Sequence, residues 1–162
     1  MDNNTLTIYI CLLIGLLVLI IAIPAARTSS IKKKMQMLAD NTLEVTPQEF
    51  FKTRNASNGG RGRKHISGRY NFAGVYIIFN KTKNMFYVGQ SKNVFSRVNN
   101  HFTGHGNGDV VYADFKAGDE FTIKMVSLEG SGCSSLNELE RNYIGIYKAY
   151  SKGYNKTRGN RG

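Results

Sequence analysis

The chain of 162 residues contains only two cysteines and only 11 acidic residues, against 22 lysines and arginines. Cys11 lies in an apolar run and Cys133 in a predicted loop, so the sequence provides no disulfide framework. It also lacks a clear Cys-His constellation, and neither cysteine is therefore expected to be catalytic. The formal net charge is +11. A small protein this basic is expected to attract polyanions, of which nucleic acid fits best.

Charged side chains are missing from residues 3–26, and residues 6–26 are predominantly apolar. A helix that spans a bilayer needs ~20 apolar residues, so this run predicts a membrane anchor within residues 1–27. A signal peptide is the competing interpretation, supported by the small residues at 22–26, but no Lys or Arg precedes the run. Arg27 and Lys32 to Lys34 follow it. The positive-inside bias then predicts a single-pass protein with its N-terminus outside and the remainder in the cytoplasm.

Two tyrosine motifs, Gly74-Val75-Tyr76 and Tyr87-Val88-Gly89, flank a predicted turn at residues 80–84. Residues 74–80 and 85–88 are rich in β-branched and aromatic side chains, which predicts an antiparallel hairpin. Strand periodicity places Tyr76 and Tyr87 on neighbouring strands, where their side chains can meet. Packing is the ordinary role of such a pair. Residues 121–128 alternate between apolar and polar side chains and predict a third strand.

Two helices are predicted around these strands. Ser91 is a good N-cap for the first, and its apolar residues at helical spacing are expected to pack on the sheet: Val94, Phe95, Val98 and Phe102. Arg97 and His101 lie four residues apart and share a different face, which is by default solvated. The second helix begins with a capping box at residues 135–138 and is expected to end at Gly153.

Glu140 falls on the apolar side of this second helix, one turn from Leu136 and from Ile144. A buried, unpaired carboxylate is costly, so Glu140 is expected to hold a cation or a metal. A salt bridge to Arg97 is the simpler alternative. Asn155 follows the helix in a Gly-Tyr-Asn segment, where it can be a simple turn residue.

The hairpin, the arginine-bearing helix, the glutamate-bearing helix and the Gly-Tyr-Asn segment together resemble the GIY-YIG nuclease family over about residues 70–159. Both tripeptides match the family's motifs with Val in place of Ile. The resemblance implies an α/β (α+β) fold, with a small three-stranded antiparallel sheet flanked by helices, preceded here by one N-terminal transmembrane helix. It also implies the catalytic residues: Tyr76, Tyr87, Arg97, His101, Glu140 and Asn155.

Only one carboxylate stands out in this region, which favours a single divalent cation, Mg²⁺ or Mn²⁺, held by Glu140, phosphate oxygens and waters. The resemblance implies the same arrangement. Arg97 is expected to neutralise the scissile phosphate, because a guanidinium can bind two oxygens at once. Asn155 is expected to orient a loop or a water and to take no part in the chemistry itself.

By resemblance, Tyr76 is the better candidate for the general base, with Tyr87 orienting water or phosphate, although the two roles could be exchanged. A free phenol has a pKa of roughly 10. Tyr76 would therefore need a cation or a basic partner near it, such as Lys92, His101 or Arg97.

Residues 28–69 are predicted to be a basic juxtamembrane linker, with a helix near residues 31–38 that meets anionic lipid. A capping box with Pro47 at its second position predicts a short helix through Phe50 and Phe51, whose rings are expected to dock on the domain. Arg61, Arg63 and Lys64 lie in a glycine-rich stretch that is either a solubilising linker or an arm that tracks DNA. Lys92 is a further candidate contact to nucleic acid.

The sequence thus predicts an anchor (residues 1–27), a linker (28–69) and a GIY-YIG nuclease-like domain (70–162). Its predicted activity is that of a divalent-metal-dependent endonuclease that hydrolyses DNA while tethered to a membrane. The sequence contains no helix-turn-helix or zinc finger, so specific targeting would need an unidentified partner, and no nucleotide cofactor is expected. Two alternatives remain: a non-catalytic membrane-bound nucleic-acid tether, and a secreted nuclease released by signal cleavage.

Overall fold

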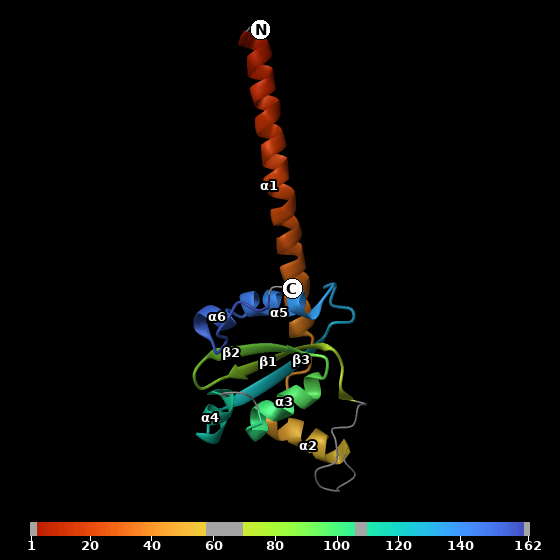
Figure 1. Ribbon diagram of the computed structural model, residues 1–162, viewed down its shortest axis with the longest axis vertical. Coiled ribbons are helices and arrows are strands. Elements are labelled where there is room, and N and C mark those ends of the chain that lie inside the picture. The colour runs from red at the N-terminus through yellow and green to blue at the C-terminus, as the bar shows by residue number, and fades with distance from the viewer. Residues whose placement is uncertain (1–2, 58–69, 106–109, 161–162) are drawn as a thin grey trace. The chain divides into compact units, whose positions relative to one another are not determined.

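The computed structural model describes residues 3–57, 70–105 and 110–160 (Figure 1). Arg61, Arg63 and Lys64, the candidate DNA contacts of the glycine-rich stretch, lie outside these residues. The chain forms two compact units, Met1–Lys34 and Met35–Gly162. One helix, α1 (Asn3–Asp40), makes up the first unit and continues into the second.

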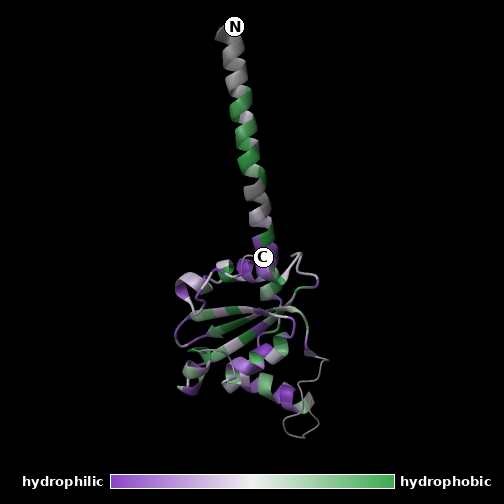
Figure 2. Cartoon of the chain, in the orientation of Figure 1, coloured by the Kyte–Doolittle hydropathy of each residue, from purple (hydrophilic) through white to green (hydrophobic). Residues whose placement is uncertain are grey.

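The first unit carries the apolar run of α1, which Figure 2 colours as its most hydrophobic stretch. Within the described residues, one helix segment, Leu12–Asp40, is long and apolar enough to cross a membrane, with a mean hydropathy of 2.1 in its most apolar window. Large apolar side chains along this stretch are exposed, among them Leu12, Leu16 and Ile20. The predicted N-terminal apolar helix is therefore present and is a candidate membrane span. A signal sequence shares both its length and its composition.

The second unit is built on three antiparallel strands in the order β2-β1-β3. These are β1 (Gly74–Asn80), β2 (Met85–Ser91) and β3 (Phe121–Ser127). The hairpin and the third strand predicted from the sequence are confirmed. In the hairpin register Tyr76 pairs with Gly89 and Tyr87 pairs with Ile78, so the two tyrosines are diagonal neighbours.

Helices cover both faces of this sheet, which confirms the predicted fold class (Figure 1). On one face lie α5 (Leu136–Ile146) and α6 (Ala149–Lys152), and on the other lie α2 (Pro47–Ser57), α3 (Val94–Thr103) and α4 (Val110–Lys116). The central strand β1 divides its side chains between the two layers with period two. Val75 and Ile77 join the core under α5, and Tyr76 and Ile78 join the core under α3.

Residues 35–57 belong to this packed unit, whereas the sequence assigned them to a linker. Met35 and Ala39 are fully buried in the core under α5, and Phe50 is buried in the core under α3. Val45 exchanges two backbone hydrogen bonds with Ile123 of β3, 3.0 and 2.8 Å long. The sequence predicted that the aromatic residues of α2 dock on the domain, as Phe50 does, but it did not predict the packing of Met35, Ala39 and Val45.

The capping box of α2 forms as predicted. The Thr46 amide donates to Glu49 Oε2 at 2.7 Å, and the Glu49 amide donates back to Thr46 Oγ1 at 3.2 Å. The box of α5 is modified: Ser135 Oγ accepts from the Glu138 amide, but the Glu138 carboxylate accepts from Ser134.

The predicted start of α3 is wrong, whereas the predicted helix end at Gly153 is confirmed, because Gly153 is the C-cap of α6. Ser91 is the last residue of β2, and α3 follows Asn93, whose side chain makes no capping hydrogen bond. The Ser91 hydroxyl instead accepts from the Asn93 amide, which is a turn contact. The second helix is interrupted at Lys148, which takes φ +53° and separates α5 from α6. A non-glycine residue in that conformation gives no clear sequence signal, because apolar spacing continues across it to Tyr150.

Candidate active site

A cleft of about 270 Å³ opens along the outer strand β2 of the sheet. Because β2 is an edge strand, residues from both helical layers reach this cleft: α3 and α4 from one face, α5 from the other, and the segment that follows α6. The cleft brings together five of the six predicted catalytic residues: Tyr87, Arg97, His101, Glu140 and Asn155. The sixth, Tyr76, lies behind them and contacts His101.

Tyr76, Tyr87 and His101 form a compact aromatic cluster. The Tyr76 hydroxyl and His101 Nε2 are joined by a 3.0 Å hydrogen bond. The Tyr87 ring centroid lies 4.9 Å from the His101 ring and 6.0 Å from the Tyr76 ring. His101 is 4% exposed, so the expectation of a solvated Arg97–His101 face is wrong for the histidine. Its partner is a strand residue 25 positions earlier, which helical spacing does not indicate.

The glycine of the second motif makes room for this cluster. An ideal Cβ on Gly89 would lie 2.2 Å from the Tyr76 hydroxyl oxygen, a separation that real Cβ atoms do not adopt. Gly74 of the first motif has a similar constraint, since a Cβ there would meet the Val126 carbonyl of β3. Both motif glycines are therefore required by close approach and not by an unusual backbone conformation.

Burial raises the pKa of Tyr76 well above its ordinary value of 10.0, and the neighbouring Tyr87 raises it further. The Arg97 guanidinium opposes this effect but does not cancel it. Tyr76 therefore keeps its proton near neutral pH in the free protein. Deprotonation of Tyr76 would need an immediate proton acceptor, and His101 Nε2 is already within hydrogen-bond distance of its hydroxyl.

Glu140 and Arg97 bring opposite charges to the cleft from opposite helical layers, and Lys156 of the tail adds a further positive charge. Glu140 is 9% exposed, as expected from its place on the apolar side of α5. Gln90 at the end of β2 donates to Glu140 Oε2 at 3.0 Å and to Asn137 Oδ1 at 2.6 Å, which fixes the carboxylate against the strand. Arg97 is half-buried on α3, one turn before His101.

The donor set can be tested against a divalent cation. Among the described residues, no group of three or more His, Cys, Asp or Glu side chains lies close enough to bind a metal. Of the described residues that line the cleft, Glu140 alone is acidic. Mg²⁺ typically keeps several waters and takes one or two carboxylates together with substrate phosphate oxygens. The residues present fit such a site, and they do not form an all-protein cage.

Asn155 acts on the strand. Its side-chain amide accepts from the Val88 amide at 2.9 Å and donates to the Val88 carbonyl at 2.7 Å. The backbone beside it is tied down as well, because the Tyr154 amide donates to the Phe86 carbonyl and the Asn155 amide to the Ala149 carbonyl. Gly153 permits this approach, since a Cβ there would meet the Phe86 carbonyl. The Gly-Tyr-Asn segment thus docks the tail onto β2 and forms one wall of the cleft.

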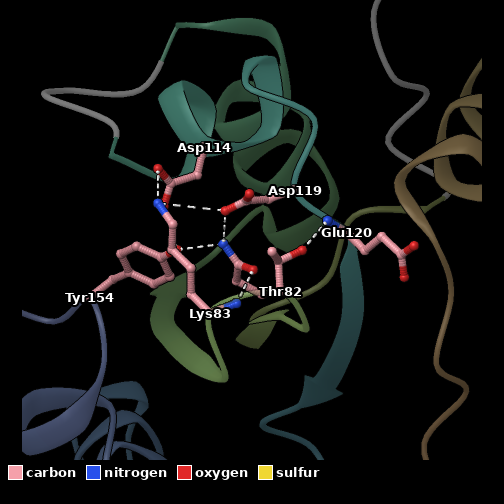
Figure 3. A network of polar contacts seen from close by, with 7 residues as sticks. Thr82, Lys83, Asp114, Asp119, Glu120 and Tyr154 are labelled. Atoms are coloured by element: carbon pink, nitrogen blue, oxygen red, sulfur yellow. Dashed lines mark hydrogen bonds and ion pairs between the residues drawn. The ribbon is translucent and has the colours of Figure 1, made fainter.

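The Tyr154 side chain extends this docking into a polar network at the hairpin turn (Figure 3). Its hydroxyl donates to Asp114 Oδ2 at 2.6 Å and accepts from Asn80 Nδ2 at 2.7 Å. Asn80 also donates to Asp119. Lys83 pairs with Asp114 at 2.6 Å and lies 3.6 Å from Asp119. The network joins the turn, α4, the loop before β3 and the tail.

Some cleft residues were not predicted, and one candidate lies elsewhere. Lys92 is exposed between β2 and α3 and is not among the residues that line the cleft. The unpredicted residues come from α4 and the tail: Val110, Val111, Tyr154, Lys156, Thr157 and Asn160. The tail residues adjoin Asn155 in sequence, which is the signal that would have found them. The α4 residues follow a glycine-rich segment and give no such signal.

Comparison with known proteins agrees with the arrangement of these elements. A family model described as the GIY-YIG catalytic domain matches residues 72–155, slightly more than half of the chain. The match begins two residues before β1 and ends at Asn155, so it includes the three strands, the helices α3 to α6 and the Gly-Tyr-Asn segment. Searches of curated proteins and of solved structures gave no match.

Proposed function

The chain belongs to the GIY-YIG family of catalytic domains, a nuclease family, and from that premise we propose that it is a divalent-metal-dependent endonuclease acting on DNA. The observation that carries the proposal is the convergence on one cleft of a cationic guanidinium, a buried carboxylate and a phenol–imidazole cluster. Hydrolysis of a phosphodiester requires charge neutralisation, an activated water and stabilisation of the leaving oxygen. The cleft residues offer chemistry for each requirement.

Arg97 and Glu140 are assigned to the charged groups of the reaction. Arg97 binds the non-bridging oxygens of the scissile phosphate, since a guanidinium presents two parallel donors to such a group. Glu140 would hold the Mg²⁺ or Mn²⁺ ion, and Gln90 keeps the carboxylate in place through its 3.0 Å hydrogen bond. When bound, the ion supplies Lewis-acid stabilisation of negative charge on the phosphate.

Tyr76, His101 and Tyr87 are assigned to the attacking water. In the His101 tautomer protonated on Nδ1, Nε2 accepts the hydrogen bond of the Tyr76 hydroxyl. As Tyr76 takes a proton from the water, its own proton passes to His101, so no free phenolate of high pKa has to accumulate. Tyr87, which lines the cleft, orients the water or the phosphate. Asn155 holds the tail against β2 through its two hydrogen bonds to Val88.

We further propose that α1 anchors the enzyme in a membrane, with the N-terminus outside and the nuclease unit in the cytoplasm. The apolar segment within Leu12–Asp40 and the basic residues that follow the run support this placement. N-terminal sequencing of protein from a membrane fraction tests it. An intact Met1 supports an anchor, and a new N-terminus near residue 26 contradicts it and favours a secreted enzyme.

The activity is tested with the full-length protein in nonionic detergent and supercoiled, linear, single-stranded and branched DNA, each with Mg²⁺ and with chelator. Glu140→Gln keeps the size and the Gln90 contact but removes the charge. We expect it to slow cleavage by at least about 10²-fold, because a metal's charge stabilisation is worth several kcal/mol. Glu129→Gln, at an exposed site outside the cleft, is the matched control and should cleave like the wild type.

The same assay separates the assigned roles. Tyr76→Phe should reduce the cleavage rate by about 10²–10⁴-fold, the usual contribution of acid–base catalysis, with DNA binding retained. Full activity of either Glu140→Gln or Tyr76→Phe would refute the corresponding assignment. DNA binding without cleavage of any substrate by the wild type would overturn the nuclease and favour the non-catalytic tether.

A further inference from the structure

The last part of the chain carries charge of a single sign. From Arg141 onward the sequence has six lysines and arginines and no aspartate or glutamate. Three consecutive residues of this region, Lys156, Thr157 and Arg158, are exposed on the tail that follows the Gly-Tyr-Asn segment. We refer to residues 156–158 as the basic span. Lys156 and Thr157 line the same cleft as Arg97 and Glu140.

The basic span is held at both of its ends. Before it, Asn155 makes two hydrogen bonds to Val88, and the Tyr154 hydroxyl is bound by Asn80 and Asp114 (Figure 3). After it, Gly159 turns the chain with φ +96°, and Arg141 donates to the Asn160 carbonyl at 2.7 Å. The three exposed residues therefore lie between two fixed points. A loop ordered before it binds a ligand loses less conformational entropy on binding.

The cations of the span are available to a ligand. The ion pairs found among the described residues involve Lys83 and Lys124, not Lys156 or Arg158. The Arg158 guanidinium lies 5.6 Å from the ring centroid of Tyr150, which is 45% exposed. An arginine over an exposed aromatic ring keeps its outward donors free for a planar anion such as a phosphate. A structural role would instead have paired these charges with carboxylates.

We propose that the basic span is a phosphate-binding rim that holds the DNA backbone beside the scissile phosphate, with Lys156 contacting a phosphate at the cleft and Arg158 a phosphate further along the strand. This rests on the proposed nuclease function and specifies its substrate-binding surface. Lys156 and Arg97 line the same cleft, so one ligand must reach both. This favours a nucleic-acid backbone as the ligand of the basic span. Contacts of this kind position the strand and carry no sequence information.

The rim is tested by measuring DNA affinity against salt concentration, with chelator present so that no cleavage occurs. Each lost phosphate contact should lower the slope of log K against log salt by about 0.9 on duplex DNA or about 0.7 on single strands. We expect one such decrease for Lys156→Gln and about twice that for Lys156→Gln combined with Arg158→Gln. The full-length protein in detergent is used throughout. Lys52→Gln is the control, because it removes the same charge from the exposed face of α2, which adds no residue to the cleft.

The possible results separate the rim from the nuclease. An unchanged slope in the double variant would overturn the rim. A decrease in Lys52→Gln equal to that in Lys156→Gln would overturn it as well, because nonspecific loss of charge would then explain the effect. That result leaves Mg²⁺-dependent cleavage by the wild type unaffected. Conversely, a reduced slope in the double variant supports the rim even where the wild type binds DNA and cleaves none. Far-UV circular dichroism confirms that the variants are folded.

Discussion

Replacing Gly89 with alanine adds one methyl group where the Tyr76 hydroxyl lies. The new Cβ would be 2.2 Å from the hydroxyl oxygen and 2.4 Å from Cζ, so the ring or the strand has to shift by more than about 1 Å to restore an ordinary contact of about 3.5 Å. Tyr76 is 1% exposed and bonded to His101, and β2 is paired with β1 along its length. Neither partner can move without disturbing the core.

Two costs follow from this clash. Overpacking a filled core costs typically about 1–3 kcal/mol. Displacing the Tyr76 hydroxyl also breaks its hydrogen bond with His101, which contributes about 0.5–1.5 kcal/mol. We therefore expect Gly89→Ala to lower the free energy of unfolding by about 2–4 kcal/mol. Alanine is not disfavoured at this strand position by an unusual φ, and its lower entropy in the unfolded chain offsets at most about 1 kcal/mol of the cost of the close approach.

The control is Gly145→Ala, the same substitution in α5. A Cβ at Gly145 meets nothing within 4 Å, and replacing a helical glycine by alanine stabilises by about 0.5–1 kcal/mol. Urea unfolding followed by far-UV circular dichroism should therefore shift the two midpoints in opposite directions, with similar m-values. A Gly89→Ala midpoint equal to that of the wild type would refute the steric account of the second motif.

Two further predictions concern the docked tail and its network. Asn155→Asp keeps an acceptor for the Val88 amide but leaves the Val88 carbonyl facing a carboxylate, so we expect a loss of about 1–3 kcal/mol in urea unfolding; an unchanged midpoint would show that the pairing contributes nothing. Burial alone would raise the pKa of Asp114, but the hydrogen bonds from Lys83 and Tyr154 outweigh it and hold that pKa below the ordinary 3.8. The Asp114 carboxylate therefore stabilises the fold above about pH 4, and this contribution is lost as the pH falls through the lower folded value. Stability measured against pH should fall less steeply in this acid range for Asp114→Asn, and identical curves would contradict the assigned shift.

The sequence predicted those elements whose signal is local and periodic. The hairpin, β3 and the buried stripe of α3 each follow from spacing within a few residues, and so does the burial of Glu140 on α5. The residues that the GIY-YIG resemblance singled out lie together at one cleft, apart from Tyr76, which is one hydrogen bond behind it. Their roles in the reaction stay predictions.

The elements that the sequence did not predict depend on partners distant in the chain. His101 is buried because Tyr76 of β1 meets it, and helical spacing alone places it on a solvated face. Asn155 was expected to be a turn residue or to orient a loop or a water, and its pairing with Val88 joins residues 67 positions apart in the chain. Lys148 breaks the last helix without a glycine. Helix α4 was not predicted, because the glycine-rich sequence before it is typical of a loop between elements.

Both outer strands of the sheet are engaged by residues from outside it. Asn155 occupies the free side of β2 through both backbone groups of Val88, and Val45 does the same on β3 through Ile123. The unpaired N–H and C=O groups of an exposed edge strand can pair with a strand of another chain, which allows β-augmentation and aggregation. The side-chain amide of Asn155 at one edge and the backbone of the single residue Val45 at the other end the hydrogen-bonded ladder at these points. Neighbouring copies of the chain thereby lose the most direct route for joining sheet to sheet.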